Sequence, residues 1–221
     1  MKLKVCGMKY QDNINQVATL QPDYLGFIFY DKSVRFIFDN IPIVPNTIKK
    51  VGVFVDADLS EVIDKINMHK LQAVQLHGKE SPEFCRQLMA KYHSVPKGIG
   101  KSEESLEIIK VFSIKDEFNF DNLKPYEDVC DYFLFDTKGK LPGGNGYAFD
   151  WNVLKNYSST KPFFLSGGIG LDQIENIKQF KNSEASKYCY AIDVNSKFEI
   201  EPGLKNIEEL KEFKKNLSFR T

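Results

Sequence analysis

The sequence predicts an α/β protein built as a (β/α)8 barrel, and three observations favour this fold. The chain has 221 residues, a length that suits one barrel of strand–helix units. Short runs rich in β-branched and aromatic residues alternate with amphipathic stretches of about ten to fifteen residues. Polar, glycine-rich loops follow the last three runs, where such barrels bind phosphate. We therefore expect a single TIM-barrel domain over residues 1–221.

Eight runs have the composition of parallel strands buried on both faces, because most of them are continuously apolar. They are Leu3–Cys6, Tyr24–Ile28, Lys50–Val55, Ala73–Leu76, Val95–Ile99, Tyr132–Phe135, Pro162–Leu165 and Tyr190–Val194. An open doubly wound sheet is the alternative arrangement. The first turn, Cys6-Gly7-Met8-Lys9, lacks a dinucleotide-binding fingerprint, and this favours the closed barrel.

Amphipathic stretches between these runs predict the helices. They are Asp12–Leu20, Leu59–His69 with Ser60 as its cap, a helix opened by Ser81-Pro82-Glu83, Asp172–Phe180, and Leu204–Phe213. Two regions are less regular. Residues 36–48 contain two prolines and predict an irregular second helix region, and residues 101–130 predict a helix only near Glu103–Ile109.

Composition excludes several classes of protein. Lys plus Arg and Asp plus Glu both number 30, giving zero formal net charge, which argues against a broad nucleic-acid surface. No apolar window suits a membrane span or a signal peptide. The four cysteines and three histidines lack metal-ligand or disulfide-scaffold spacing, so we expect a cytoplasmic protein. The expected partner is a small molecule, and the chain could be a monomer or a homodimer.

Two strand ends carry candidate catalytic groups. Cys6 ends the first predicted strand and Asp136 follows the sixth, so both side chains should reach the same mouth of the barrel. A thiol and a carboxyl group placed there could act as base and acid. A buried cysteine can equally be a small apolar residue, and the aspartate can cap the following turn. Both interpretations stay open.

Other strand ends carry groups that suit an anionic substrate. Arg35 could grip a carboxylate with two parallel hydrogen bonds, or form a surface ion pair with Asp31 or Asp39. His77 could orient the substrate or a neighbouring side chain, or be an ordinary satisfied polar residue. Lys97 ends the predicted fifth strand and could face the barrel interior, where it would need a carboxylate partner.

Glycine-rich loops predict that the substrate is phosphorylated. Backbone N–H groups can converge on an anion only where no side chain obstructs them. Several such groups follow the sixth, seventh and eighth strands. The candidate phosphate-binding residues are Gly144, Asn145, Gly146, Ser166, Gly167, Gly168, Asn195 and Ser196.

These motifs, taken in order, resemble the phosphoribosylanthranilate isomerase family of tryptophan biosynthesis. The resemblance runs from residue 3 to about residue 206. It is carried by Lys4-Val5-Cys6-Gly7-Met8, Gly26-Phe27-Ile28-Phe29, Ser33-Val34-Arg35, Gln75-Leu76-His77-Gly78, Phe135-Asp136-Thr137, Ser166-Gly167-Gly168-Ile169 and Asp193-Val194-Asn195-Ser196 with Glu199.

The resemblance implies a barrel with no metal and no organic cofactor. It implies an Amadori rearrangement of N-(5-phosphoribosyl)anthranilate to an aminodeoxyribulose phosphate. By position, Cys6 matches the family's general base and Asp136 its general acid. Arg35 matches the residue that meets the anthranilate carboxylate, and the loops after strands six, seven and eight match the phosphate site.

Two positions depart from the family's pattern. Asn145 stands where Ser or Thr is common, and Lys197 stands where a small residue is common. Lys197 could strengthen the phosphate site or be a solvated lysine.

Two alternative functions also fit the sequence. One is another phosphosugar isomerase or epimerase, although a histidine-pathway isomerase would carry aspartate where Cys6 stands. The other is a non-catalytic barrel that binds a phosphorylated ligand, which would need neither Cys6 nor Asp136.

Overall fold

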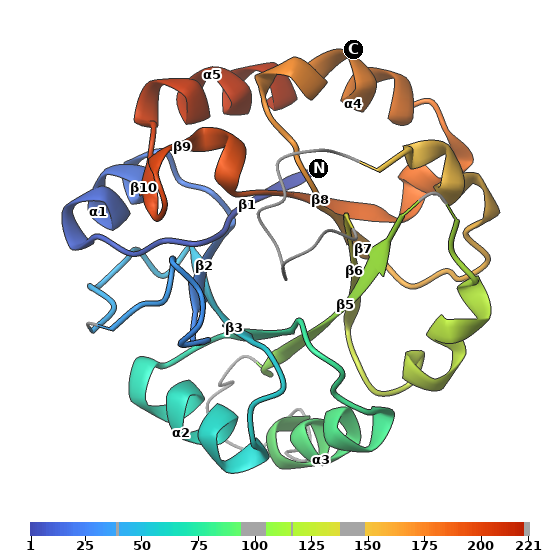
Figure 1. Cartoon of the computed structure of the whole chain (residues 1–221), viewed down its shortest axis with the longest axis horizontal. Helices are drawn as coiled ribbons and strands as arrows, with labels where there is room; N and C mark the ends of the chain where they lie inside the picture. The colour runs from blue at the N-terminus through green and yellow to red at the C-terminus, as the bar shows by residue number, and fades with distance from the viewer. Residues whose placement is uncertain (39, 94–104, 116, 138–148, 219–221) are drawn as a thin grey trace.

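The computed structural model describes the chain except residues 39, 94–104, 116, 138–148 and 219–221. Eight parallel strands close into a barrel in the order β1 to β8 (Figure 1), which confirms the predicted fold. The strands are β1 Lys2–Val5, β2 Tyr24–Ile28, β3 Lys49–Phe54, β4 Ala73–Leu76, β5 Glu107–Ile114, β6 Tyr132–Thr137, β7 Phe163–Leu165 and β8 Cys189–Val194.

Helices surround the barrel in Figure 1. The α-helices are α1 Gln11–Thr19, α2 Leu59–His69, α3 Pro82–His93, α4 Ile174–Phe180 and α5 Ile207–Ser218. Turns of 3-10 helix are η1 Phe120–Tyr126, η2 Trp151–Asn156, η3 Leu171–Gln173, η4 Glu184–Tyr188 and η5 Ser196–Phe198. A short antiparallel pair, β9 Glu199–Glu201 and β10 Leu204–Lys205, follows the last barrel strand.

Side chains alternate between two apolar layers, as expected for a closed barrel. Inside the barrel, Tyr24, Val51 and Ile109 belong to one buried cluster. Between the barrel and the helices, a larger cluster includes Phe133 and Phe163. The same alternation matters for the site, because it places every second residue of a strand inside the barrel.

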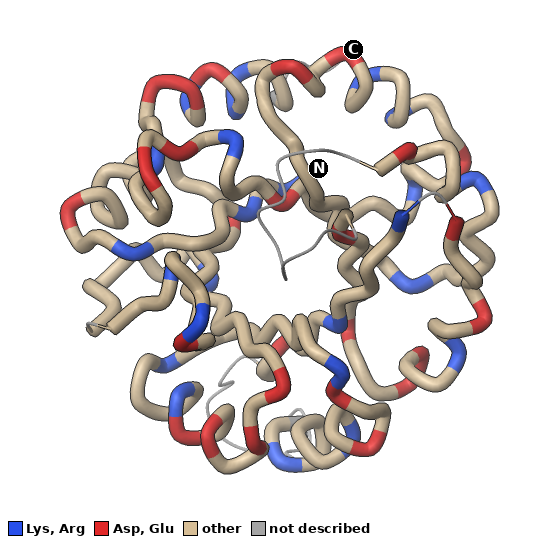
Figure 2. The backbone as a smooth tube through the Cα atoms, in the orientation of Figure 1, with Lys and Arg blue, Asp and Glu red and all other residues tan. Residues whose placement is uncertain are grey.

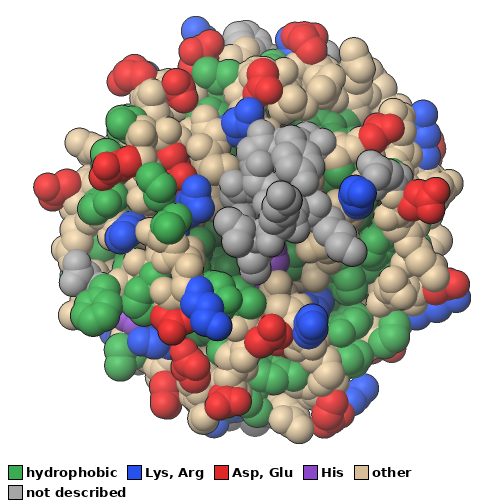
Figure 3. Space-filling model, viewed as in Figure 1, with side chains coloured by type: hydrophobic (Ala, Val, Ile, Leu, Met, Phe, Trp, Pro, Cys, Tyr) green, Lys and Arg blue, Asp and Glu red, His purple; other side chains and the backbone are tan. Residues whose placement is uncertain are grey.

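Charges of both signs are spread over the helices and loops, without one dominant sign (Figure 2). The face shown in Figure 3 likewise mixes acidic, basic and apolar side chains. Among the described residues, no helix is long and apolar enough to cross a membrane.

The fifth strand does not lie where the sequence predicted it. The predicted run, 95–99, falls in the part of the chain outside the described residues, and so does Lys97. The barrel's fifth strand is Glu107–Ile114. It overlaps the helix predicted over Glu103–Ile109, so that prediction was wrong.

A buried lysine explains why this strand was hard to identify. Lys110 lies in the middle of β5 and is 3% exposed. Its Nζ is 2.9 Å from Glu80 Oε2 and also donates to the carbonyl oxygens of Leu76 and Gly78. Because Glu80 neutralises it from another segment, the lysine can occupy a buried strand position.

Three smaller predictions also need correction. The described residues between β2 and β3 contain no helix, and Phe36 forms an isolated bridge to Ile28 instead. Asp58, not Ser60, is the N-terminal boundary residue of α2. Residues 204–205 are a strand, so the last helix begins at Ile207.

Candidate active site

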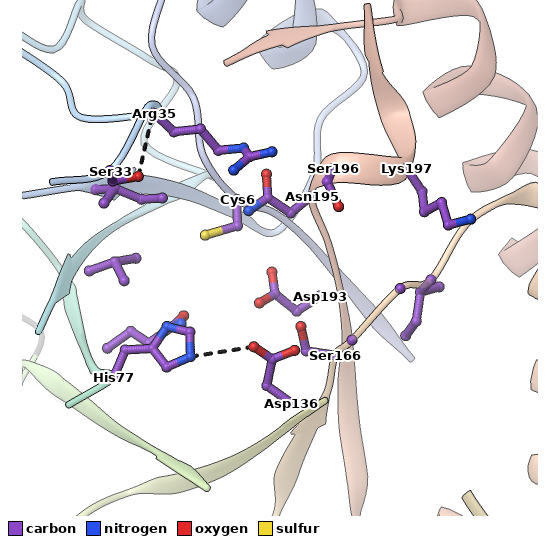
Figure 4. Close-up of a pocket in the computed structure, with 16 residues that line it drawn as sticks. Cys6, Ser33, Arg35, His77, Asp136, Ser166, Asp193, Asn195, Ser196 and Lys197 are labelled. Carbon is purple, nitrogen blue, oxygen red and sulfur yellow. Dashed lines mark hydrogen bonds and ion pairs between the residues drawn. The ribbon is translucent and has the colours of Figure 1, made fainter. Parts of the chain in front are cut away.

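One pocket opens at the carboxyl ends of the barrel strands, and most of the predicted site residues line it (Figure 4). Those residues are Cys6, Arg35, His77, Asp136, Ser166, Gly167, Gly168, Asn195, Ser196 and Lys197. Gly144, Asn145 and Gly146 lie outside the described residues. Residues that are distant in the sequence therefore meet in one place, because parallel strands all end at the same face.

Cys6 follows β1 directly and projects into the pocket. Its backbone N–H donates to the carbonyl of Val194 at 2.8 Å, which continues the pairing with β8. The neighbouring strand carries Gly26, where a Cβ atom would lie only 2.8 Å from Cys6 Sγ. Glycine at that position makes room for the thiol. Burial raises the pKa of the Cys6 thiol, and the nearby Lys4 and Lys205 ammonium groups partly oppose that rise.

A buried ion pair lies beneath Cys6. Lys4 and Asp193 are register partners on β1 and β8, and their Nζ and Oδ1 atoms are 2.9 Å apart. Lys4 is two residues before Cys6, so both side chains point to the same inner face of β1. Burial lowers the pKa of Lys4, but Asp193 and Cys6 reverse this and hold it above its ordinary value. Burial raises the pKa of Asp193.

Asp136 approaches the same pocket from β6. It is 6% exposed, and one oxygen accepts a hydrogen bond from the Thr137 backbone at 2.9 Å. The other oxygen lies 3.3 Å from His77 Nε2. In Figure 4, Cys6 and Asp136 face the same space, with Asp193 between them. This places a thiol and a carboxyl group across one pocket.

The loop after β7 brings backbone close to the pocket. Gly167 and Gly168 have φ angles of 92° and 64°, a left-handed conformation that favours glycine. A Cβ atom on Gly167 would lie 2.2 Å from Thr137 Oγ1. Ser196 begins the short turn after β8, on the neighbouring strand end. The two loops together offer backbone N–H groups to an anion.

Arg35 lines the pocket but is paired with a residue that the sequence did not suggest. Its Nε and Nη2 donate to the carboxylate of Glu199 at 2.7 to 3.0 Å. Lys205 also reaches Glu199, with 2.7 Å between Nζ and Oε1. Arg35 therefore does not pair with Asp31, and Asp39 is outside the described residues.

A protein-family model described as N-(5'phosphoribosyl)anthranilate (PRA) isomerase matches residues 3–216. The chain belongs to this isomerase family. A relative named N-(5'-phosphoribosyl)anthranilate isomerase, from Parabacteroides distasonis, is 41% identical and covers 96% of this chain and 91% of its own. The chain is thus an isomerase of tryptophan biosynthesis.

Solved phosphoribosylanthranilate isomerases have the same fold. The Thermotoga maritima enzyme superposes with a TM-score of 0.76 at 28% identity, covering 98% of each chain. A second structure, in complex with reduced 1-(o-carboxyphenylamino)-1-deoxyribulose 5-phosphate, gives a TM-score of 0.74 at 25% identity, covering 98% of this chain and 97% of that one.

The sequence predicted no individual role for four residues in and behind this isomerase's pocket, although three of them stand in the family motifs. Gln75 and Asp193 line the pocket, while Glu199 and Lys205 lie behind Arg35. The available signal was a polar residue at an inward-facing position of an otherwise apolar strand, as at Gln75. Among the described residues, no group of three His, Cys, Asp or Glu side chains could hold a metal ion.

Proposed function

We propose that this isomerase carries out the rearrangement of N-(5-phosphoribosyl)anthranilate with Cys6 as general base and Asp136 as general acid. One observation carries the assignment. A thiol and a carboxyl group lie across one pocket, and glycine-rich and polar loops suited to phosphate border that pocket. A binding protein would need neither group. The substrate is a small phosphosugar that carries an aromatic carboxylate.

Asp136 acts in the first step. Its protonated carboxyl group donates a proton to the furanose ring oxygen, and the bond between C1′ and that oxygen breaks. The nitrogen lone pair forms the C=N bond of an open-chain Schiff base. His77, 3.3 Å away, fixes the orientation of the carboxyl group. Asp136 leaves this step as a carboxylate beside the imidazole.

Cys6 acts in the second step. Its thiolate removes the proton from C2′, and the electrons of the C–H bond form the double bond of an enolamine. The C=N bond becomes a C–N single bond as its π electrons return to the nitrogen as a lone pair. The enolamine then tautomerises to the ketone of the product. The two groups must therefore hold opposite protonation states at one pH.

The two ends of the substrate are anionic, and each has a place in the pocket. The backbone N–H groups of Gly167, Gly168, Asn195 and Ser196 take the phosphate, while the Ser166 backbone N–H donates to the Phe135 carbonyl. Arg35 takes the anthranilate carboxylate. Glu199 engages Nε and Nη2 of that guanidinium, so we assign Nη1 to the substrate carboxylate. Lys197, on the turn after β8, adds a cation near the phosphate.

The decay of phosphoribosylanthranilate fluorescence tests the proposal. The substrate is generated in place, purified protein is added, and the buffer contains a chelator. We expect decay far above the spontaneous rate, with the chelator having no effect. Decay at the background rate would reject the activity, and loss of activity with chelator would reject a mechanism that uses only side chains.

We also expect the enzyme to act in the cytoplasm, as a monomer or a homodimer. All four cysteines are unpaired thiols, which suits a reducing compartment.

A further inference from the structure

Gln75 carries a buried polar atom that has no partner. It lies on β4, is 2% exposed, and its Oε1 accepts no hydrogen bond. Among the described residues, the two other such atoms are Trp151 Nε1 and Ser183 Oγ, and neither residue lines the pocket. Native proteins rarely leave a buried acceptor unsatisfied, so each case calls for an explanation.

The neighbours of Gln75 cannot satisfy it. Its register partners are Val53 on β3 and Ile109 on β5, both apolar and buried. The buried ammonium of Lys4, beneath Cys6, is engaged by Asp193 at 2.9 Å. The carboxylates of Asp136 and Asp193 also accept hydrogen bonds when ionised. The amide oxygen therefore faces a pocket with other acceptors, and a ligand must bring the donor.

The position of Gln75 indicates which part of a ligand it meets. Gln75 is on β4 and is two residues before His77, which directly follows the strand. Both side chains therefore point inward, and Gln75 lies deeper in the barrel. The proposed function places the phosphate at the loops after β7 and β8 and the carboxylate at Arg35. Both places are at the rim of the pocket. The segment between them is the sugar chain, whose hydroxyl groups are donors. That segment passes over the floor, where Gln75, Cys6 and Asp136 all line the pocket.

We infer that Gln75 is a substrate-contacting residue whose side-chain oxygen accepts a hydrogen bond from a hydroxyl group of the substrate's sugar chain. The inference rests on the proposed function, since it uses the same pocket. It explains why the enzyme keeps a destabilising polar group in its core: the ligand completes the hydrogen bond. Such a site discriminates against ligands that lack the donor, because binding them leaves the amide unpaired.

The test measures affinity and stability in the variant Gln75→Leu. The first probe is reduced 1-(o-carboxyphenylamino)-1-deoxyribulose 5-phosphate, the analogue bound to the relative described above. We expect the variant to bind it about ten- to a hundredfold more weakly than the wild type. Its melting temperature should equal or exceed that of the wild type, because leucine removes an unsatisfied group and breaks no bond.

Asn13 provides a matched control for stability. It is also a buried amide, 3% exposed, but both of its polar atoms are bonded. Its Nδ2 donates to the Lys205 carbonyl at 2.9 Å, and its Oδ1 accepts from the Lys205 N–H at 2.7 Å. Asn13→Leu should therefore lower the melting temperature clearly. A similar drop in Gln75→Leu would assign Gln75 a structural role and overturn the inference.

A second probe, ribulose 5-phosphate, identifies the donor. It has the sugar hydroxyls but no aromatic amine. If Gln75 contacts a hydroxyl, the variant should lose affinity for both probes by a similar factor. Loss for the first probe alone would place the contact on the bridging amine and overturn the inference. Equal binding of both probes by variant and wild type would overturn it as well. If the wild type bound neither probe, the proposed function would fail instead.

Discussion

The guanidinium group of Arg35 is held by Glu199, whose Oε2 lies 2.7 Å from Nη2. Glu199 comes from β9, the first strand of the short pair that follows the barrel. Although burial raises the pKa of Glu199, Arg35 and Lys205 hold it below its ordinary value. The carboxylate therefore stays ionised and links two cations. It fixes the orientation of the arginine before any substrate arrives.

Replacing Glu199 with Gln should weaken both the fold and the recognition of the substrate carboxylate. Lys205 is 1% exposed, and removal of its counter-charge leaves a buried ammonium uncompensated. We expect the free energy of unfolding to fall by about 3–5 kcal/mol. KM should rise more than kcat falls, because Arg35 loses its fixed orientation. Urea denaturation and steady-state kinetics measure the two effects, and an unchanged KM would remove Glu199 from substrate recognition.

Cys6→Ala and Asp136→Asn should each lower kcat by about 10²–10⁴-fold, the usual contribution of a general acid or base. Both should fold normally, since neither side chain anchors the barrel. Cys85→Ala is the matched control, because Cys85 is also fully buried but packs in the outer apolar layer. It should keep wild-type kcat. Near-normal turnover in Cys6→Ala or Asp136→Asn would exclude that residue from the mechanism.

Lys4 should set the pH at which Cys6 becomes a thiolate. Burial raises the pKa of Cys6, Lys4 lowers it, and Asp193 raises it. Because the base must be deprotonated, kcat/KM should rise as the pH passes the pKa of Cys6. Lys4→Met removes a positive charge and should move this rise to higher pH. Asp193→Asn removes a negative charge and should move it to lower pH.

The rate of Cys6 alkylation by iodoacetamide, followed against pH by mass spectrometry, reports the same pKa without turnover. Lys110→Met is the control. Lys110 is equally buried, but it pairs with Glu80 on the outer side of the barrel, away from the pocket. It should leave the alkylation profile of Cys6 unchanged. Shifts of the same sign in Lys4→Met and Asp193→Asn would contradict the electrostatic explanation.

Lys197 should contribute to phosphate affinity. It lines the pocket, and the loop after β7 approaches it closely: a Cβ atom on Gly170 would lie 3.1 Å from Lys197 Cβ. Lys197→Ala should raise KM by about three- to tenfold with little change in kcat, and added salt should reduce the difference. Lys178→Ala, which removes an exposed lysine on α4, should leave KM unchanged. A KM equal to that of the wild type would show that Lys197 is only a solvated residue.

Local pattern predicted much of this fold because most strands are continuous apolar runs. Tyr24–Ile28 and Ala73–Leu76 were predicted with the bounds that the structure has. The failure at β5 has a physical reason. Lys110 interrupts the apolar pattern, and its partner Glu80 lies 30 residues away, so the neighbouring sequence does not reveal the neutralised charge.

The site also has a part that the local sequence predicts and a part that it does not. Cys6, His77 and Asp136 could be placed together because parallel strands end at one face. The pairing of Arg35 with Glu199 spans 164 residues and depends on how the β9–β10 pair folds back on the barrel rim. No local pattern contains that information. Gln75 stands in a family motif, but its burial without a partner, on which its proposed role rests, is visible only in the structure.

Lys205 should make stability depend on pH in a defined window. Burial lowers the pKa of Lys205 from its ordinary 10.5 to about 8, although Glu199 opposes the change. Below about pH 8 the lysine is charged in both folded and unfolded chains, and the cost of burying it is fully present. Between about pH 8 and 10.5 the unfolded chain binds a proton that the folded chain has lost. Stability therefore rises with pH in this window.

The difference in unfolding free energy between the wild type and Lys205→Met isolates this effect. Between pH 8 and pH 10, the unfolding free energy of the wild type should rise by about 2–3 kcal/mol relative to that of the variant. Urea denaturation at closely spaced pH values measures it. Lys110→Met keeps Lys205 and should therefore keep the wild-type rise. A flat difference between the wild type and Lys205→Met would mean that Lys205 keeps its proton throughout, held by Glu199 and the two Asn195 oxygens to which it donates.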